Sequence, residues 1–526
     1  MSRSGHTLTW SFDTIRDASF LRQLQSDAPD VVLVGPRWPA ISEPSIGTCV
    51  RLALALATRK HLAKLTLCEP GELHLLVLQE FLKGGGTLAY LGLDISIMGN
   101  ETLRILEGVL KHSHSLQTLT FDCCDCDLDD MADLSGVFLA EALNYSHSLQ
   151  SFTLNCGHTV MGDASGALLA QALKHSQSLQ SFTLNCNDTI MGDASGAALA
   201  EALEHNQTLQ TFMLNCSRTT MGDESGLALA GALEQSQSLQ TIFLSCKQTS
   251  MGEASGIALA EALKHNRSLQ SFGLCCSFDG MDAVSGAALA RALNHNRTLQ
   301  TFWFSCYVMD DVNGAALAEA LKHNLTLQSL TLICGDMGDA VCGALAEALK
   351  HNQTLQTFSL DCGDTEMGDT SVAALAQALK HNCTLRTCKL QWYGMTDASA
   401  AALAQALEHN HTLQSCTLGV PFADVHNESI DAALRRNVEL LHTRRALAAL
   451  ARRSEVAGLR TLASHDFRDQ LLSYFMAPSC TTSPRYFGAS ADGQRQQEMI
   501  TPLARISANN GARTCGGTAL ISINFP

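Results

Sequence analysis

The feature that most constrains this chain is a short internal repeat. An octet such as Leu-Gln-Ser-Phe-Thr-Leu-Asn-Cys at 149–156 recurs at a constant interval in the centre of the chain and at slightly different intervals on either side. A unit this short cannot bury its apolar face alone, so its copies must stack into an elongated solenoid. The thirteen octets begin at Leu62, Leu88, Leu116, Leu149, Leu179, Leu209, Leu239, Leu269, Leu299, Leu327, Leu355, Leu385 and Leu413.

Each repeat contains the pattern of one strand and one helix. The first, fourth and sixth residues of the octet are apolar, which is typical of a strand with one buried face. The following segment, for example 194–203, has alanines and leucines at helical spacing. We expect Asp193 to be the N-cap of this helix, Asn206 to end it in the left-handed conformation, and His205 to face the negative end of the helix dipole.

These repeats predict an α/β solenoid with a parallel sheet on its concave face and helices on its convex face. The octet at 327–334, the following Gly335 to Asp339, and the helical segment 343–349 resemble the ribonuclease-inhibitor-like leucine-rich repeat. That type of repeat also occurs in NLR innate-immune receptors and in Ran GTPase-activating protein, and the resemblance covers roughly residues 60–440. The resemblance implies that the solenoid is curved into a horseshoe. The ninth strand position departs from the family pattern where this chain has Gly157 or Gly335, because the family usually has Asn or Cys there.

The periodicity also predicts how the chain is divided. Residues 1–61 form an N-terminal cap, with a helix at 13–25 and a strand at 30–34 that is a degenerate first repeat. Residues 62–434 form the repeat array. Residues 435–478 are rich in Ala, Leu and Arg at helical spacing and form a C-terminal helical cap, since a solenoid must cover its last apolar layer. Residues 479–526 have no periodicity and are expected to be an irregular or flexible tail.

Charge and hydropathy limit the partners and the compartment. The formal net charge of −16 argues against nucleic acid, which requires a clustered basic surface. The N-terminus has no signal-peptide pattern, and no apolar run approaches the roughly 20 residues of a membrane span. We therefore predict a cytoplasmic protein that does not bind a membrane. In that reducing compartment the 20 cysteines are expected to be buried thiols.

Aspartate, cysteine and histidine each recur at a fixed position of successive repeats, and we call each such set a column. Each column has a structural explanation. Aspartates such as Asp163, Asp193 and Asp223 fit helix N-caps. The cysteines fit buried packing positions, although adjacent strands would also allow metal binding, most densely at 123–126. The histidines fit helix ends, and no nucleophile stands out beside one of them. The cysteine column is Cys123, Cys156, Cys186, Cys216, Cys246, Cys276, Cys306, Cys334 and Cys362, and the histidine column is His175, His205, His265, His295, His323, His351, His381 and His409.

The third, fifth and seventh octet positions should face the concave space, because they alternate with the core. The fifth position is usually Thr, but four consecutive repeats have Met213, Phe243, Gly273 and Trp303. Three strand spacings make this a patch ~14 Å long. One interpretation is a binding site for a partner protein, with Gly273 forming a recess between anchors. The other is that neighbouring aromatic side chains merely cover one another.

The sequence therefore predicts a scaffold that binds a partner protein on its concave face. It has no phosphate loop and no hydrolase signature, so we expect no enzymatic activity, no catalytic or metal-binding residue and no cofactor. The resemblance leaves two alternatives open. One is regulation or activation of a GTPase, as in Ran GTPase-activating protein, and the other is an NLR-like regulator of innate immunity.

Overall fold

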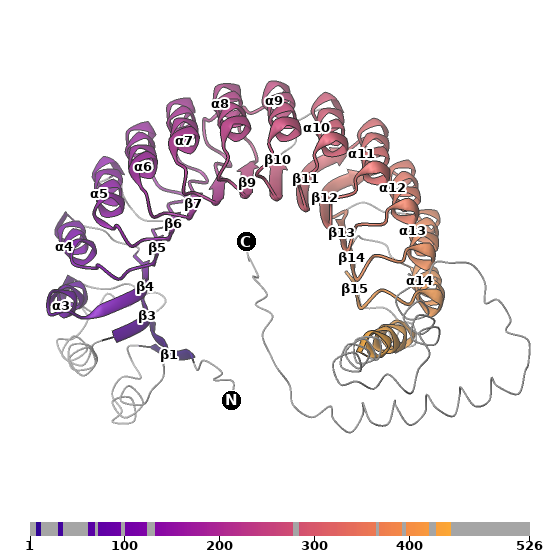
Figure 1. Cartoon of the computed structure of the whole chain (residues 1–526), viewed down its shortest axis with the longest axis horizontal. Helices are drawn as coiled ribbons and strands as arrows, with labels where there is room; N and C mark the ends of the chain where they lie inside the picture. Colours follow the sequence, from indigo (N-terminus) through magenta and orange to yellow (C-terminus); the bar gives the residue numbers. More distant parts are fainter. Residues whose placement is uncertain are drawn as a thin grey trace, which may run out of the picture.

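One parallel sheet runs through the part of the chain that the structure describes. The structure is a computed structural model, which describes residues 7–11, 30–34, 61–68, 72–95, 100–123, 132–276, 283–363, 368–391, 396–419 and 428–442. Within these ranges, 15 strands lie side by side in the order of the sequence. The strands line the inner side of an arc and the helices line its outer side (Figure 1). The predicted open α/β solenoid is confirmed.

Strand and helix alternate regularly along the array. The strands are β1 (Thr7–Ser11), β2 (Asp30–Val34), β3 (His61–Cys68), β4 (Thr87–Asp94), β5 (Thr118–Asp122), β6 (Ser151–Asn155), β7 (Ser181–Asn185), β8 (Thr211–Asn215), β9 (Thr241–Cys246), β10 (Ser271–Cys276), β11 (Thr301–Met309), β12 (Ser329–Met337), β13 (Thr357–Asp361), β14 (Thr387–Gln391) and β15 (Ser415–Leu418). The helices are α3 (Glu72–Lys83), α4 (Asn100–Lys111), α5 (Ala132–Tyr145), α6 (Asp163–His175), α7 (Asp193–His205), α8 (Asp223–Gln235), α9 (Glu253–His265), α10 (Ala283–His295), α11 (Asp311–His323), α12 (Asp339–His351), α13 (Asp369–His381) and α14 (Asp397–His409). A further helix spans 428–442.

The strand register places the predicted octet positions in the core. In β7 and the residues before it, Leu179, Phe182 and Leu184 are fully buried, whereas Ser181 and Thr183 are partly exposed on the other face. Equivalent residues of neighbouring repeats are paired, so the phenylalanines at the fourth position stack from strand to strand. The ring centroids of Phe182 and Phe212 are 5.9 Å apart. The alternation seen in the sequence therefore sets which side chains line the concave face.

The sheet begins earlier than the thirteen octets. The strand expected at 30–34 is present as β2 and pairs with β3. A strand that the sequence analysis missed, β1, pairs with β2, because so short an alternating segment does not stand out as a pattern. The helix expected at 13–25 lies outside the described residues, as do 443–478 of the proposed C-terminal cap and the segment 479–526.

The aspartates are not N-caps of their own helices, which corrects the prediction for Asp193. The N-cap of α7 is Gly192, and it makes no side-chain capping bond. Asp193 is displaced by one residue into the helix, where its carboxylate reaches the neighbouring helix instead. Its Oδ1 accepts hydrogen bonds from the backbone N–H of Gly222 at 2.8 Å, the backbone N–H of Ser225 at 3.1 Å and the Ser225 hydroxyl at 2.5 Å. Each such aspartate therefore caps the next helix along the array.

The same arrangement is repeated on both sides of α7. Asp163 accepts from Gly192 and Ser195 at the start of α7, and Asp223 accepts from Gly252 and Ser255 at the start of α9. Burial alone would raise the pKa of these carboxyls, but hydrogen bonds from the next helix outweigh it and hold each pKa below its ordinary value. These contacts therefore stabilise the ionised form of the three carboxyl groups.

The asparagine after each helix does not adopt the predicted left-handed conformation. Asn206 has φ −79° and ψ 124°, which is extended. Its amide Nδ2 donates to the backbone carbonyls of Leu173 (2.8 Å) and Ser176 (3.0 Å) in the preceding repeat, while its Oδ1 accepts from the N–H groups of Thr208 and Leu209. The side chain satisfies backbone groups on two repeats, and this role favours Asn over Gly. Buried asparagines that donate to the preceding repeat in the same way are Asn266, Asn296, Asn324, Asn352, Asn382 and Asn410.

Candidate functional site

The structure brings the three predicted binding residues together on the concave face. Met213, Phe243, Gly273 and Trp303 are aligned in register across β8, β9, β10 and β11. The side chains of Met213, Phe243 and Trp303 are half-buried, and each lies opposite the core residues of its own strand. Large apolar groups therefore occupy the position that carries Thr153, Thr183 and Thr331 in β6, β7 and β12.

The expected recess at Gly273 is absent, because Phe243 lies over it. A Cβ built on Gly273 would come within 2.3 Å of Cδ2 of the Phe243 ring. The Phe243 and Trp303 rings touch across this glycine, with centroids 4.9 Å apart and planes inclined by 52°. Gly273 is therefore the residue that lets two aromatic side chains from non-adjacent strands meet. The result is one continuous aromatic surface rather than two anchors around a hollow.

Tyr307 extends this surface and was missed by the sequence analysis. It lies beyond Trp303 on the same strand, is 44% exposed, and its ring lies 2.7 Å from the position of a Cβ on Gly335. The sequence contains one signal that could have pointed to Tyr307, which is the shorter length of its repeat. The octet at Leu327 begins earlier than the constant interval of the central repeats predicts, and β11 continues for nine residues where β6 to β10 have five or six. We call Met213, Phe243, Trp303 and Tyr307 the aromatic patch.

The sheet face on the N-terminal side of the aromatic patch is polar and hydrogen-bonded. Asn185 Nδ2 donates to Asn155 Oδ1 at 2.7 Å, and Asn155 Nδ2 donates to Asp122 Oδ1 at 2.9 Å. From β6 to β12, the third, fifth and seventh octet positions carry no charged residue. The aromatic patch is therefore the most apolar part of an otherwise neutral, hydroxyl-rich surface.

The loops that follow β6 to β9 form a rim with mixed charge. His158, Asp188, Arg218 and Gln248 occupy the same loop position, each with a φ between 55° and 59°. Asp188 lies 3.1 Å from His158 Nδ1 and 3.9 Å from an Arg218 guanidinium nitrogen, and Arg218 Nε donates to Gln248 at 2.7 Å. These four side chains thus interact with one another along the rim.

The rim that follows β11 to β14 is acidic. Its described residues, 305–313, 333–341, 361–363, 368–371 and 396–399, contain no lysine or arginine. The nearest base on the sheet is Lys389, in the middle of β14. We call these carboxylates the acidic rim: Asp310, Asp311, Asp336, Asp339, Asp361, Asp369 and Asp397.

The cysteine column is structural in the described repeats. Cys186 is fully buried, its thiol donates to the backbone carbonyl of Asn215 on the next strand at 3.3 Å, and burial raises its pKa well above the ordinary value. Such a thiol is inert and joins neighbouring repeats. Among the cysteines of the array, Cys383 is an exception to the predicted thiols, because it lies in a loop outside the column and is disulfide-bonded.

No group of three or more His, Cys, Asp or Glu in the described ranges is placed to hold a metal ion. Of the cluster at 123–126, Cys123 donates its S–H to Asn155, while 124–126 lie outside the described residues. The histidines lie at helix ends as predicted: His205 contacts the carbonyl of Glu201, and His265 contacts the Glu261 carboxylate at 2.8 Å. None of the described helices is long and apolar enough to span a membrane.

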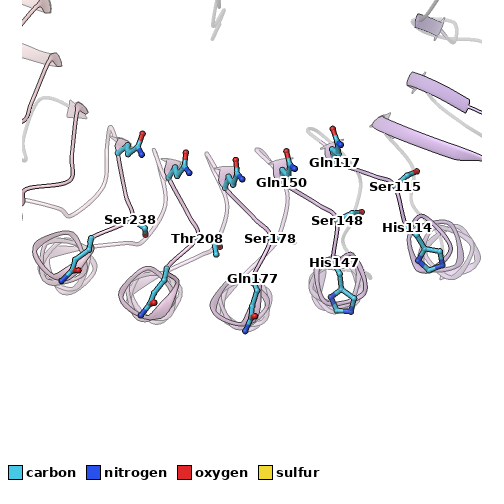
Figure 2. A pocket seen from close by; sticks show the side chains of 15 residues that line it. His114, Ser115, Gln117, His147, Ser148, Gln150, Gln177, Ser178, Thr208 and Ser238 are labelled. Atoms are coloured by element: carbon cyan, nitrogen blue, oxygen red, sulfur yellow. The ribbon is translucent and has the colours of Figure 1, made fainter.

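A polar groove with a volume of about 820 Å³ runs along the edge where the helices lead into the strands. Figure 2 shows that each of five repeats contributes a strand-edge glutamine, a hydroxyl and a loop His or Gln to it. Hydroxyls such as Ser148 and Thr208 donate to the carbonyls of Leu116 and Leu179 in the preceding repeat. The groove carries no carboxylate and no lysine or arginine, and its hydroxyls serve the joints between repeats.

Comparison with known proteins leaves the function open. No protein-family profile matches the chain, and no curated protein is similar to it. Among solved structures, it is similar to one titled "Leiomodin-1 Actin-Binding Site 2 (ABS2)", at 21% identity and a TM-score of 0.24, over 26% of this chain and 79% of that chain. A similarity this distant carries no argument about function.

Proposed function

We propose that this chain is a protein-binding scaffold of the ribonuclease-inhibitor-like leucine-rich-repeat type, and that its partner docks on the aromatic patch. The observation that supports this most is the contact between Phe243 and Trp303 over Gly273, on a sheet face exposed to the concave space. Aromatic and Met side chains of this kind are enriched among the residues that dominate binding energy in interfaces. The proposal includes a cytoplasmic location, no enzymatic activity and no cofactor.

The surroundings of the aromatic patch support a protein rather than a nucleic acid as its partner. A net charge of −16 and a neutral central sheet face supply none of the phosphate contacts that nucleic-acid binding requires. Hydroxyl and amide groups around an apolar centre resemble the composition of protein interfaces, which have an apolar core and a polar rim.

The test is affinity capture from native cell extract with the full chain as bait, followed by quantitative mass spectrometry. The baits are the parent chain, the double variant Phe243→Ala with Trp303→Ala, and the control Thr153→Ala on the concave face of β6. A partner that docks on the aromatic patch should fall at least about tenfold in the double variant, because each truncated hot-spot residue typically costs ~2 kcal/mol or more. It should be retained by the control.

The two alternatives give different results in the same experiment. Capture of a small GTPase, with faster GTP hydrolysis on addition of the full chain, would replace the scaffold proposal by the GTPase-regulating one. Capture of innate-immune signalling proteins would support an NLR-like role. Equal recovery of every specific partner by the parent and the double variant would place the docking site elsewhere.

A further inference from the structure

Cys306 and Cys334 differ in their contacts from the cysteines of the central repeats. A central cysteine such as Cys186 donates its S–H to a backbone carbonyl of the next strand, that of Asn215. Cys306 and Cys334 are instead paired in register on β11 and β12, and their Sγ atoms are 3.6 Å apart. Both strands continue beyond these cysteines, so the two thiols lie side by side within the paired part of the sheet.

Cys306 is the more accessible of the two thiols. It is partly exposed, whereas Cys334 is fully buried. Cys306 also lines a cavity of about 30 Å³ between β11 and the helices α10 and α11, which is comparable with the volume of one water molecule. Asn313 lines the same cavity, and its buried Oδ1 has no hydrogen-bond partner in the part of the chain that the structure describes. A small molecule with O–H groups matches both the size of this cavity and the acceptor that is left open there.

We propose that Cys306 and Cys334 form a redox-active thiol pair, which hydrogen peroxide converts to a disulfide between β11 and β12. Neighbouring strands place paired Cα atoms ~4.8 Å apart, within the range of ~4.4–6.8 Å that disulfides span. The sulfur atoms are already in contact, and bonding brings them from 3.6 Å to ~2.05 Å. In the proposed cytoplasmic location this disulfide is transient, because reducing thiols reverse it.

The two thiols have different roles in this reaction. The hydrogen bond with Cys306, together with burial, raises the pKa of Cys334, so Cys334 keeps its proton and the reaction begins at Cys306. The Cys306 sulfur attacks one peroxide oxygen, the O–O bond breaks, and a sulfenic acid and a water molecule form. The Cys334 sulfur then attacks the Cys306 sulfur, the S–O bond breaks, and the hydroxyl leaves as water with the Cys334 proton. Two thiols and one peroxide thus give one disulfide and two water molecules.

The test is treatment of the reduced full chain with hydrogen peroxide, at concentrations that leave its circular dichroism unchanged. Free thiols are then alkylated, and the peptides are mapped by mass spectrometry. We expect a cross-linked pair of peptides that contains Cys306 and Cys334, and its loss when dithiothreitol is added before alkylation. Cys186 is the internal control, because it is fully buried and should be oxidised at least about tenfold more slowly than Cys306.

Two variants separate the steps of the reaction. Cys334→Ser removes the second thiol and should leave a sulfenic acid on Cys306, which dimedone labels, whereas Cys306→Ser should abolish both this label and the cross-link. Cys388 and Cys416 are also in register, on β14 and β15, and their peptides are mapped in the same experiment. A parent chain in which Cys306 stays reduced, or is linked to a cysteine other than Cys334, would overturn the inference. Equal rates of oxidation at Cys186 and Cys306 would also overturn it, because the reaction would then not be specific to this pair.

Discussion

The aspartate at the start of α6, α7 and α8 shows how a single residue can couple two repeats. Asp193 lies in α7, yet the groups that it satisfies belong to α8, and its pKa is held below the ordinary value by those hydrogen bonds although burial opposes this. A carboxylate at this position also faces the positive end of the neighbouring helix dipole, which stabilises its negative charge. Capping and stacking of repeats are therefore the same interaction.

We predict that Asp193→Ala destabilises the array by about 1 kcal/mol, the typical cost of a lost cap. Chemical denaturation at pH 7 measures it, with Glu224→Ala as the control, because that exposed residue adds acidity to the first turn of α8 without capping a neighbour.

The loss of stability caused by Asp193→Ala should depend on pH in a defined direction. A carboxyl whose folded pKa is lowered contributes its full stabilisation above the unfolded pKa near about 3.9 and loses it as the pH falls through the folded pKa. The difference between parent and Asp193→Ala should be constant from about pH 5 to 7 and shrink below about pH 4. A difference that grew in acid would contradict the trans cap.

At the scale of the elements, close contact between helices depends on a small residue facing a serine. A Cβ on Gly196 in α7 would lie 2.1 Å from the Ser225 hydroxyl oxygen in α8, the same hydroxyl that donates to Asp193. Gly231, also in α8, has nothing within 4 Å of its Cβ position. A methyl group therefore has no room at Gly196, whereas it has open space at Gly231.

We predict that Gly196→Ala destabilises the array by ~1–3 kcal/mol through overpacking. Gly231→Ala should stabilise it by up to ~1 kcal/mol, because alanine favours the helix and finds open space. Denaturant midpoints of the two variants test this directly. If both substitutions shifted stability in the same direction, the helices would not pack as closely at Gly196 as the structure has it.

At the scale of the whole molecule, a stacked array has ends whose last layer must be covered. The helix at 428–442 contacts the end of α14. The Arg436 guanidinium donates to the carbonyls of Leu407 (2.9 Å), Glu408 (2.9 Å) and Asn410 (2.7 Å), which are groups that the end of α14 leaves without helical partners. Asn437 continues the asparagine column by donating to the carbonyls of Asn410 and Leu413.

We predict that Arg436→Ala loosens the C-terminal end of the array, because three carbonyls lose a charged donor at a cost of ~1–3 kcal/mol. Backbone amides of α14 should then exchange with deuterium faster, while those of α7 should not change, since repeat arrays unfold locally. Arg435→Ala is the control, because the Arg435 guanidinium donates to the carbonyl of Asp431 on its own helix. Equal exchange in both variants would argue against the cap.

The sequence by itself determined the repeat, the alternation of strand and helix, and the concave position of Met213, Phe243 and Trp303. These follow from period-2 and period-3.6 patterns, which depend on residues that are close along the chain. They set the fold class and the orientation of each strand's side chains before any contact is known.

Only the tertiary structure decided which repeat each polar or aromatic side chain serves. Asp193 caps the next helix, Asn206 bonds the preceding repeat, and Phe243 covers Gly273 to meet Trp303. These contacts join residues about one repeat apart or more, through side chains whose direction depends on the spacing between stacked layers. A local pattern fits the predicted role of each residue and its observed role equally well. An aspartate can cap its own helix or the next one, an asparagine can adopt the left-handed conformation or bond the preceding repeat, and a glycine can leave a recess or be covered by a neighbouring ring. The packing of one layer on the next selects between them.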